Sequence, residues 1–218
     1  MDWQAWHESY DMPDSSLARR LRVVQERIRL ALDACPDGPL RCVSLCSGQG
    51  RDVLEVLADH PRRDDVRARL VELDPRSVAI ARAAIEAAGL RQVEVIAADA
   101  ALTDHYLEMV PADLVLVCGL FGNIEKNDIE RTIDACCRLC KTGGTVIWTR
   151  HREEPDLVPL ICRWFEVRDF VQEWLSEPGA GFGVGVHRFE GRPEPLVPGQ
   201  RMFTFIGFDV LKGRDASA

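Results

Sequence analysis

Residues 43–50 read VSLCSGQG, an apolar run that ends in two glycines with one residue between them. A helical pattern of apolar residues follows from Asp52 to about Asp59. Glycines at such a turn let the backbone approach a ligand closely, and the next helix presents unpaired N–H groups at its N-terminus. In doubly wound sheets, ligands bind beyond the carboxyl ends of the strands. The stretch therefore predicts a strand, a ligand-binding loop and a helix.

Apolar runs alternate with helical patterns on both sides of this stretch. A helix is expected over residues 16–34, where apolar residues recur at steps of three and four and Ser15 or Ser16 can act as the N-cap. Asp74, which precedes a proline, is typical of another N-cap, and Gly89 is expected to end that helix. Strands are expected over 41–46, 68–73, 93–97, 113–118 and 145–149. This alternation predicts a doubly wound, mostly parallel α/β sheet.

The second half of the chain changes its pattern. Asn127 and Glu130 resemble a capping box that opens a helix reaching about Cys140, and a further helix is expected over 155–165. Three strand-like runs then follow without a helical pattern between them, over 170–175, 183–189 and 202–208. An antiparallel C-terminal end to the sheet fits this order. The predicted organisation is a helical extension or lid over 1–37 and one ligand-binding domain over 38–218.

An acid after the second predicted strand points to the kind of ligand. Glu72 comes 22 residues after Gly50, where its carboxylate can accept hydrogen bonds from both ribose hydroxyls of a nucleoside. Asp74 competes for this role, but its position as an N-cap favours Glu72. A dinucleotide-binding loop usually has a third glycine, and Val53 stands at that position. A nucleoside ligand without a phosphate therefore fits better than a nicotinamide dinucleotide, and a nicotinamide oxidoreductase is disfavoured.

With these residues the chain resembles the class I S-adenosylmethionine-dependent methyltransferases. Residues 43–50 resemble their glycine-rich first motif, and residues 72–75 look like their second. The resemblance implies Glu72 on the ribose and Leu73 against the adenine. One departure is Ser44, since the family often has an acid at this position of the first motif.

The resemblance extends over roughly residues 38–208. Residues 98–100 are similar to the third motif, which implies Asp99 on the adenine amino group, and residues 113–118 match the fourth strand. It implies a seven-stranded sheet, to which residues 183–189 are an additional strand. S-adenosylmethionine is the expected cofactor. The residues expected to bind it are Cys46, Ser47, Gly48, Gly50, Glu72, Leu73, Asp99, Ala100 and Cys118.

The loop after the fourth predicted strand lies where the family places its acceptor. Residues 118–123 read CGLFGN, which is neither the Asn/Asp-Pro-Pro-aromatic sequence of amino-methylating nucleic-acid enzymes nor the Pro-Cys pair of cytosine C5 enzymes. The formal charge of −8 also disfavours nucleic acid as a partner. We therefore expect a methyltransferase acting on a small molecule, with O- and N-methylation both open. A non-catalytic domain that binds or senses S-adenosylmethionine is the alternative.

Polar residues after the fifth predicted strand are candidates for the acceptor side. His151 is expected to act as a base or acceptor contact, because an imidazole can take a proton at neutral pH. Arg150 and Arg152 flank it, but strand alternation keeps all three from lining one pocket. The candidate substrate-binding residues are Phe121, Asn123, Arg150 and Tyr10. Phe121 fits a position in the hydrophobic core equally well. The aromatic segment around Tyr10 can be either a lid over the site or a structural clasp on the core.

The rest of the composition argues against a membrane protein, a secreted protein and a metal-binding protein. No run approaches the length of a membrane span, and the acidic, aromatic N-terminus is unlike a signal peptide, so a cytoplasmic protein without membrane contact is expected. The eight cysteines should be thiols in that compartment. Cys137 and Cys140 form a CxxC without a second ligand pair, so no metal is expected. Whether the chain is a monomer or a homodimer stays open.

Overall fold

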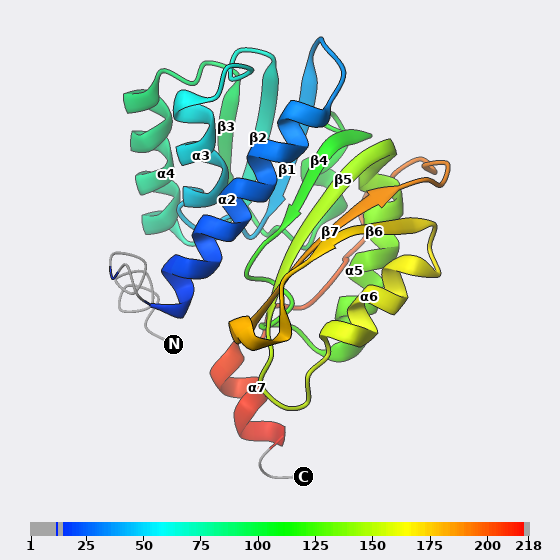
Figure 1. Ribbon diagram of the computed structural model, residues 1–218. Coiled ribbons are helices and arrows are strands. Elements are labelled where there is room, and N and C mark those ends of the chain that lie inside the picture. The colour runs from blue at the N-terminus through cyan, green and yellow to red at the C-terminus, as the bar shows by residue number, and fades with distance from the viewer. Residues whose placement is uncertain (1–11, 13–14, 216–218) are drawn as a thin grey trace.

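The computed structural model describes Met12 and residues 15–215 of the 218-residue chain. In this part, seven strands form one sheet in the order β3-β2-β1-β4-β5-β7-β6 (Figure 1). The strands are β1 Leu40–Leu45, β2 Val66–Glu72, β3 Val93–Ala97, β4 Ala112–Val117, β5 Cys140–His151, β6 Phe170–Leu175 and β7 Phe182–Phe189. Neighbouring strands from β3 to β5 pair in parallel, and β7 runs antiparallel to both β5 and β6. The predicted doubly wound sheet with an antiparallel end is confirmed.

Helices cover both faces of this sheet. The helices are α2 Ser16–Ala34, α3 Arg51–Asp59, α4 Pro75–Ala88, α5 Lys126–Leu139, α6 Val158–Glu166 and α7 Phe208–Asp215, with 3-10 turns η2 Thr103–Tyr106 and η3 Pro178–Ala180. In Figure 1, α2, α3 and α4 lie over one face, and α5 and α6 over the other. Each face has its own buried apolar cluster, so the sheet is sandwiched between two cores. No helix in the described ranges is long and apolar enough to cross a membrane.

Local capping signals place several helix ends where the sequence predicts them. Ser15 Oγ accepts a hydrogen bond from Ala18 N at 3.0 Å and opens α2. Asp74 Oδ2 accepts from Ser77 N at 2.9 Å and opens α4, which ends at Gly89 with a φ of 64°. Asp74 thus opens α4 directly after the carboxyl end of β2, and Gly89 ends it before β3 begins.

Two predictions in the second half are wrong. The helix α5 has Glu125 as its N-cap, with no side-chain capping bond, so Asn127 lies inside the helix and forms no capping box. Residues 202–207 form no strand, because β7 occupies the edge of β5 and this segment bonds to loops instead. Met202 N donates to Ala101 O at 2.8 Å and Ile206 N donates to Asn123 O at 2.9 Å. The strand over 182–189 is therefore one of the seven and not additional to them. We call residues 200–207 the C-terminal strap.

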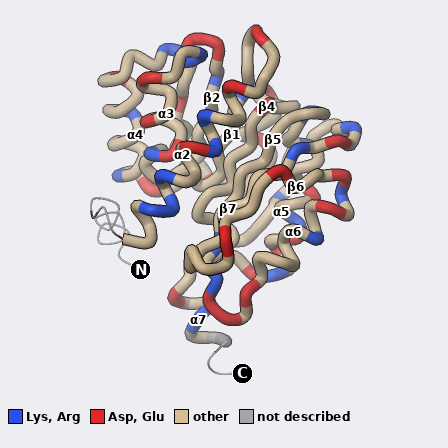
Figure 2. The backbone as a smooth tube through the Cα atoms, in the orientation of Figure 1, with Lys and Arg blue, Asp and Glu red and all other residues tan. Residues whose placement is uncertain are grey.

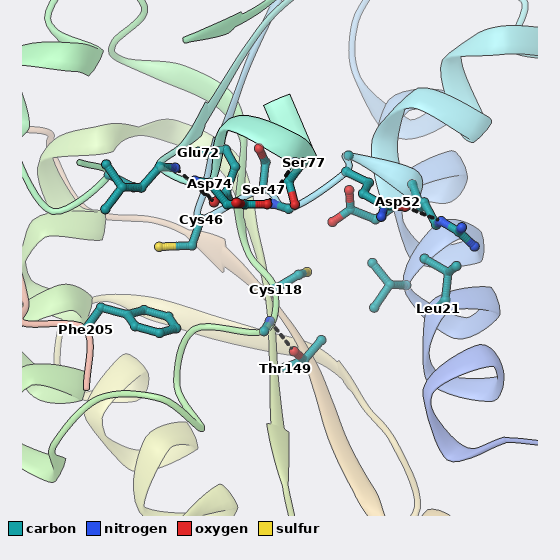
Figure 3. A pocket seen from close by; sticks show the side chains of 18 of the residues that line it. Leu21, Cys46, Ser47, Asp52, Glu72, Asp74, Ser77, Cys118, Thr149 and Phe205 are labelled. Atoms are coloured by element: carbon teal, nitrogen blue, oxygen red, sulfur yellow. Dashed lines mark hydrogen bonds between the residues drawn. The ribbon is translucent and has the colours of Figure 1, made fainter. Parts of the chain in front are cut away.

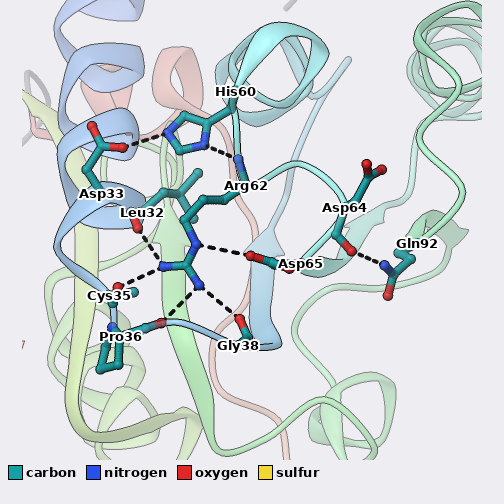
Figure 4. A network of polar contacts seen from close by, with 10 residues as sticks. All are labelled: Leu32, Asp33, Cys35, Pro36, Gly38, His60, Arg62, Asp64, Asp65 and Gln92. Carbon is teal, nitrogen blue, oxygen red and sulfur yellow. Dashed lines mark hydrogen bonds and ion pairs between the residues drawn. The ribbon is translucent and has the colours of Figure 1, made fainter.

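The C-terminal end of α2 is held by one arginine. Arg62, in the loop between α3 and β2, donates from Nη1 to Leu32 O at 3.1 Å and to Cys35 O at 2.7 Å (Figure 4). Its Nη2 donates to Pro36 O and Gly38 O, both at 2.9 Å. A guanidinium group has five N–H donors in a fixed fork, so it can satisfy several helix-end carbonyls at once. This contact fixes α2 across the sheet.

Candidate active site

The loop after β1 turns sharply through left-handed backbone conformations. The φ angles are 50° at Cys46, 55° at Gly48 and 69° at Gly50. At Gly50 an added Cβ would lie 2.6 Å from the Leu70 side chain and 2.9 Å from that of Leu54. Glycine is therefore required there both by the backbone conformation and by the close packing of α3 on β2. The result is a tightly turned backbone cradle at the carboxyl end of β1, formed by residues 46–50.

The Glu72 carboxylate joins this cradle to the end of β2. Its Oε2 accepts a hydrogen bond from Gly48 N at 2.7 Å, and its Oε1 accepts from Leu73 N at 2.9 Å and Asp74 N at 2.8 Å (Figure 3). A carboxylate has about four lone-pair sites, so these three bonds leave about one for a ligand. Glu72 thus fixes the first and second motifs relative to each other. To bind both hydroxyls of a ribose it would have to release one backbone donor.

A pocket of about 550 Å³ lies over these two strand ends. Its wall includes all nine residues that the sequence predicts for the cofactor: Cys46, Ser47, Gly48, Gly50, Glu72, Leu73, Asp99, Ala100 and Cys118. These residues come from the ends of β1, β2, β3 and β4, which the parallel sheet brings to one edge. Their function as cofactor ligands stays a prediction, but the fold gathers them into one cavity.

The pocket also has walls that sequence reasoning missed. Arg20, Leu21 and Val24 of α2 line it, as do Phe203 and Phe205 of the strap. Figure 3 shows Leu21 and Phe205 on opposite sides of the cavity. Leu21 and Val24 belong to an apolar stripe that predicts only core packing, and the alternation in the strap predicts a strand. Only the long-range packing of these segments shows that they face a pocket.

Asp99 is held at the β3 side of the pocket. Its Oδ1 accepts from Ala101 N at 3.0 Å, and its Oδ2 accepts from Arg201 Nη2 at 2.9 Å. Both Asp99 and Arg201 are partly exposed, so the ion pair contributes little to stability by itself. The strap therefore contacts the acid expected to bind the adenine amino group.

The β4 side of the pocket contains Cys118, Gly119 and Thr149. Gly119 N donates to Thr149 Oγ1 at 2.7 Å, which ties the loop after β4 to the end of β5. Asp52, from the first turn of α3, also lines this side. Burial raises the pKa of Asp52 to about 6, against the lowering effect of hydrogen bonds from Val53 N and the Cys118 thiol.

Of the residues predicted for the acceptor, the three that the structure describes, Phe121, Asn123 and Arg150, do not line this pocket. Phe121 is fully buried and packs against Trp148, with 6.0 Å between ring centroids. Asn123 donates to Gly119 O at 2.6 Å and accepts from Phe208 N at 2.9 Å, so it anchors the loop and the chain beyond the strap. Arg150 is buried and donates to Phe121 O. Their geometry is that of structural residues. Tyr10, with the other N-terminal aromatics, lies outside the described residues.

His151 lies at the end of β5 but away from the cavity. Its ring packs edge-on against Phe208 at 5.0 Å, and Nδ1 accepts from Glu153 N at 3.2 Å. Burial and the charge of Arg150 lower the pKa of His151 to about 4. At neutral pH the ring is uncharged, but a group with so low a pKa is a weak base. The pocket geometry gives the predicted catalytic role no support.

The cysteines within the described ranges form no metal centre. All eight are free thiols, and no group of three or more metal-ligating side chains occurs among the described residues. Cys137 lies in α5, where its thiol donates to Ile133 O at 3.7 Å, and Cys140 begins β5. The CxxC is thus split between two elements.

Comparison with known proteins bears on the identity of this site. Residues 43–144 match a family model described as a methyltransferase domain. This segment is therefore similar to a methyltransferase domain. It includes the cradle, Glu72, Asp99 and the end of β4, so the predicted resemblance to the S-adenosylmethionine-dependent methyltransferases is confirmed, and S-adenosylmethionine is the cofactor of this class.

Several solved structures share the fold of this chain. An O-methyltransferase family protein from Burkholderia thailandensis is 19% identical with a TM-score of 0.64, over 87% of this chain and 61% of that one. An rRNA methylase from Streptococcus thermophilus is 15% identical with a TM-score of 0.59, over 76% and 95% of the two chains. An RNA methyltransferase from Salinibacter ruber, in complex with S-adenosylhomocysteine, is 22% identical with a TM-score of 0.54, over 81% and 96%.

These similarities extend to the fold and not to the acceptor. The chain spans about three fifths of the length of the Burkholderia protein. A search of curated proteins found no match.

Proposed function

We propose that this methyltransferase transfers a methyl group from S-adenosylmethionine to the oxygen or nitrogen of a small molecule. The observation that carries the proposal is the pocket itself. Its floor consists of the predicted cofactor residues, while α2 and the strap enclose it on two sides with Leu21, Val24, Phe203 and Phe205. Apolar walls of this kind exclude water from the reacting centre.

The residues present fit the cofactor. The loop with Gly48 and Gly50 lines the pocket, and the carboxylates of Glu72 and Asp99 supply acceptors for a ribose hydroxyl and an adenine amino group. The bound cofactor supplies a methyl group on a positively charged sulfur. The chain itself has to orient an acceptor in line with that group, and Cys118, Gly119 and Thr149 form the nearby wall at the ends of β4 and β5.

Charge supports a small acceptor over a nucleic acid. The chain carries a formal charge of −8, and in Figure 2 acidic and basic residues alternate along the helices without forming a basic band in that view. Binding to phosphate backbones depends on clustered lysine and arginine. Two of the proteins that share the fold methylate RNA. The choice between a small molecule and RNA is therefore the first part of the proposal to test.

The test follows label from methyl-tritiated S-adenosylmethionine. The protein is incubated with the small-molecule fraction and, separately, with the RNA fraction of a cell extract. We expect label in the small-molecule fraction, reduced at least tenfold in Glu72→Ala because a charge-assisted hydrogen bond to the cofactor is lost. Label in RNA would overturn the acceptor class. Tight S-adenosylhomocysteine binding without transfer to either fraction would favour the alternative, a non-catalytic sensor.

His151 remains a proposed acceptor contact. Since its ring packs on Phe208 and not in the pocket, His151→Gln tests it with the same label. Retained S-adenosylhomocysteine affinity with lost transfer would support the role, and unchanged transfer would remove it.

A further inference from the structure

The side chain of Asp52 places a carboxyl group in the pocket wall. It takes no part in the turn of the cradle or in the predicted contact with the ribose. Asp52 is the second residue of α3, and its Oδ1 accepts from Val53 N at 2.8 Å. Figure 3 shows its side chain entering the pocket from the α3 side, across from Glu72 and Asp74. No ion pair joins it to a cation among the described residues. An acid partly withdrawn from water without a cation is costly, so a positively charged ligand group would be favoured here.

The order of the strands decides which end of a ligand reaches Asp52. Since β1 lies between β2 and β4, Glu72 and Asp99 lie on one side of the cradle and Cys118 on the other. The nucleoside end belongs with Glu72 and Asp99. A ligand that crosses the cradle from there extends toward Cys118 and Asp52, which both line the pocket.

A basic residue lies at the same end. Arg20 of α2 lines the pocket and is near enough to the Cys118 thiol to oppose, through its charge, the rise in pKa that burial causes. Asp52 and Arg20 therefore present opposite charges on the two helices that border this end. S-adenosylmethionine ends in an amino acid, which carries an ammonium and a carboxylate. The charges of the wall match that end.

We propose that Asp52 binds the ammonium group of the cofactor's amino-acid end, with Arg20 facing its carboxylate, in place of the acid that the first motif lacks at Ser44. Ser44 is buried in β1 and does not line the pocket. This inference rests on the cofactor of the proposed function and concerns the binding of that cofactor, not the acceptor.

The test compares two ligands by calorimetry. S-adenosylhomocysteine has the amino-acid end, and 5′-methylthioadenosine keeps the nucleoside and the sulfur without it. Asp52→Asn should weaken S-adenosylhomocysteine binding about 10- to 150-fold, as expected for a lost charge-assisted hydrogen bond, and change 5′-methylthioadenosine binding less than about twofold. Glu72→Gln should weaken both ligands. Glu55→Gln removes an acid one turn further along α3, outside the pocket wall, and should change neither.

The outcomes separate this inference from the proposed function. Equal losses for both ligands in Asp52→Asn, or no loss for either, would overturn the role of Asp52 alone. If the unaltered protein binds neither ligand, the cofactor assignment itself fails. A measurement on the unaltered protein avoids the problem of a variant that misfolds. This protein should bind an S-adenosylhomocysteine analogue without the amino group at least tenfold more weakly than S-adenosylhomocysteine. Equal affinity for the two ligands would also overturn the proposal.

Discussion

His187 illustrates how surroundings decide the chemistry of a single residue. It is fully buried in β7, where its Nδ1 accepts from Trp148 Nε1 at 3.1 Å and its ring stacks on Phe165 at 4.6 Å. Its Nε2 has no hydrogen-bond partner among the described residues. Burial lowers the pKa of His187 to about 4 from 6.5. The folded protein therefore holds this ring uncharged, although an unfolded chain would protonate it in mild acid.

This difference predicts a loss of stability in mild acid. Because the folded pKa is lower than the unfolded one, the contribution of His187 is complete above about pH 6.5 and is lost as the pH falls toward 4. Between pH 7 and 5 the loss from this site should be about 2 kcal/mol of unfolding free energy. His187→Gln, which keeps an acceptor for Trp148 but cannot titrate, should reduce that loss in urea titrations. His151→Gln is the comparison: burial also lowers the pKa of His151 to about 4, but its ring is half-buried, so solvent screens its charge and its removal should reduce the loss less. Equal slopes in the unaltered protein and His187→Gln would contradict the prediction.

Among the elements, α2 is anchored at its C-terminal end by the side chain of Arg62. Arg62 satisfies carbonyls at the end of this helix, and α2 in turn supplies Leu21 and Val24 to the pocket. Its buried residues Val24, Ile28 and Leu32 belong to the same apolar cluster as the sheet. The helix thus packs as part of the core. It lies within residues 1–37, for which the sequence predicts a separate helical extension.

Removing the guanidinium fork should destabilise the fold. Arg62→Ala leaves partly buried carbonyls without donors, and we expect a loss of about 2–4 kcal/mol in urea unfolding. Arg67→Ala is the matched control: Arg67 is exposed on β2, and its loss should cost less than about 0.5 kcal/mol. Similar losses in the two variants would show that Arg62 does not anchor α2.

The same elements show which features are readable from sequence. The ends of α2 and α4 were predictable because Ser15, Asp74 and Gly89 act on backbone within a few residues of themselves. The gathering of the predicted cofactor residues in one pocket was predictable because parallel strands bring their carboxyl ends to one edge. The conformation of the strap was not predictable, because its alternating pattern suits a strand but β7 occupies the place beside β5. The surroundings of Phe121 and His151 were not predictable for a related reason: their contacts with Trp148 and Phe208 join residues that are remote in sequence.

At the scale of the whole molecule, the pocket joins parts of the chain that are far apart in sequence. A ligand that binds only this assembled state stabilises it by mass action. At one hundred times its dissociation constant, S-adenosylhomocysteine should add about 2.7 kcal/mol and raise the Tm by roughly 5–11 °C. Thermal unfolding monitored by fluorescence or calorimetry measures this. Adenine alone at equal concentration is the control and should raise the Tm less, and a Tm that does not respond to S-adenosylhomocysteine would contradict the site.

The strap also bears on the order in which this protein becomes functional during synthesis. The cradle, β2 and β3 emerge early from a ribosome, but Phe203 and Phe205 come after every strand of the sheet. Arg201 must then reach back to Asp99, 102 positions earlier in the chain. A nascent chain that has completed the sheet still has an open nucleoside site, because one wall has not yet been translated. Tight cofactor capture therefore belongs to the finished chain, and unfinished chains should not sequester the cofactor.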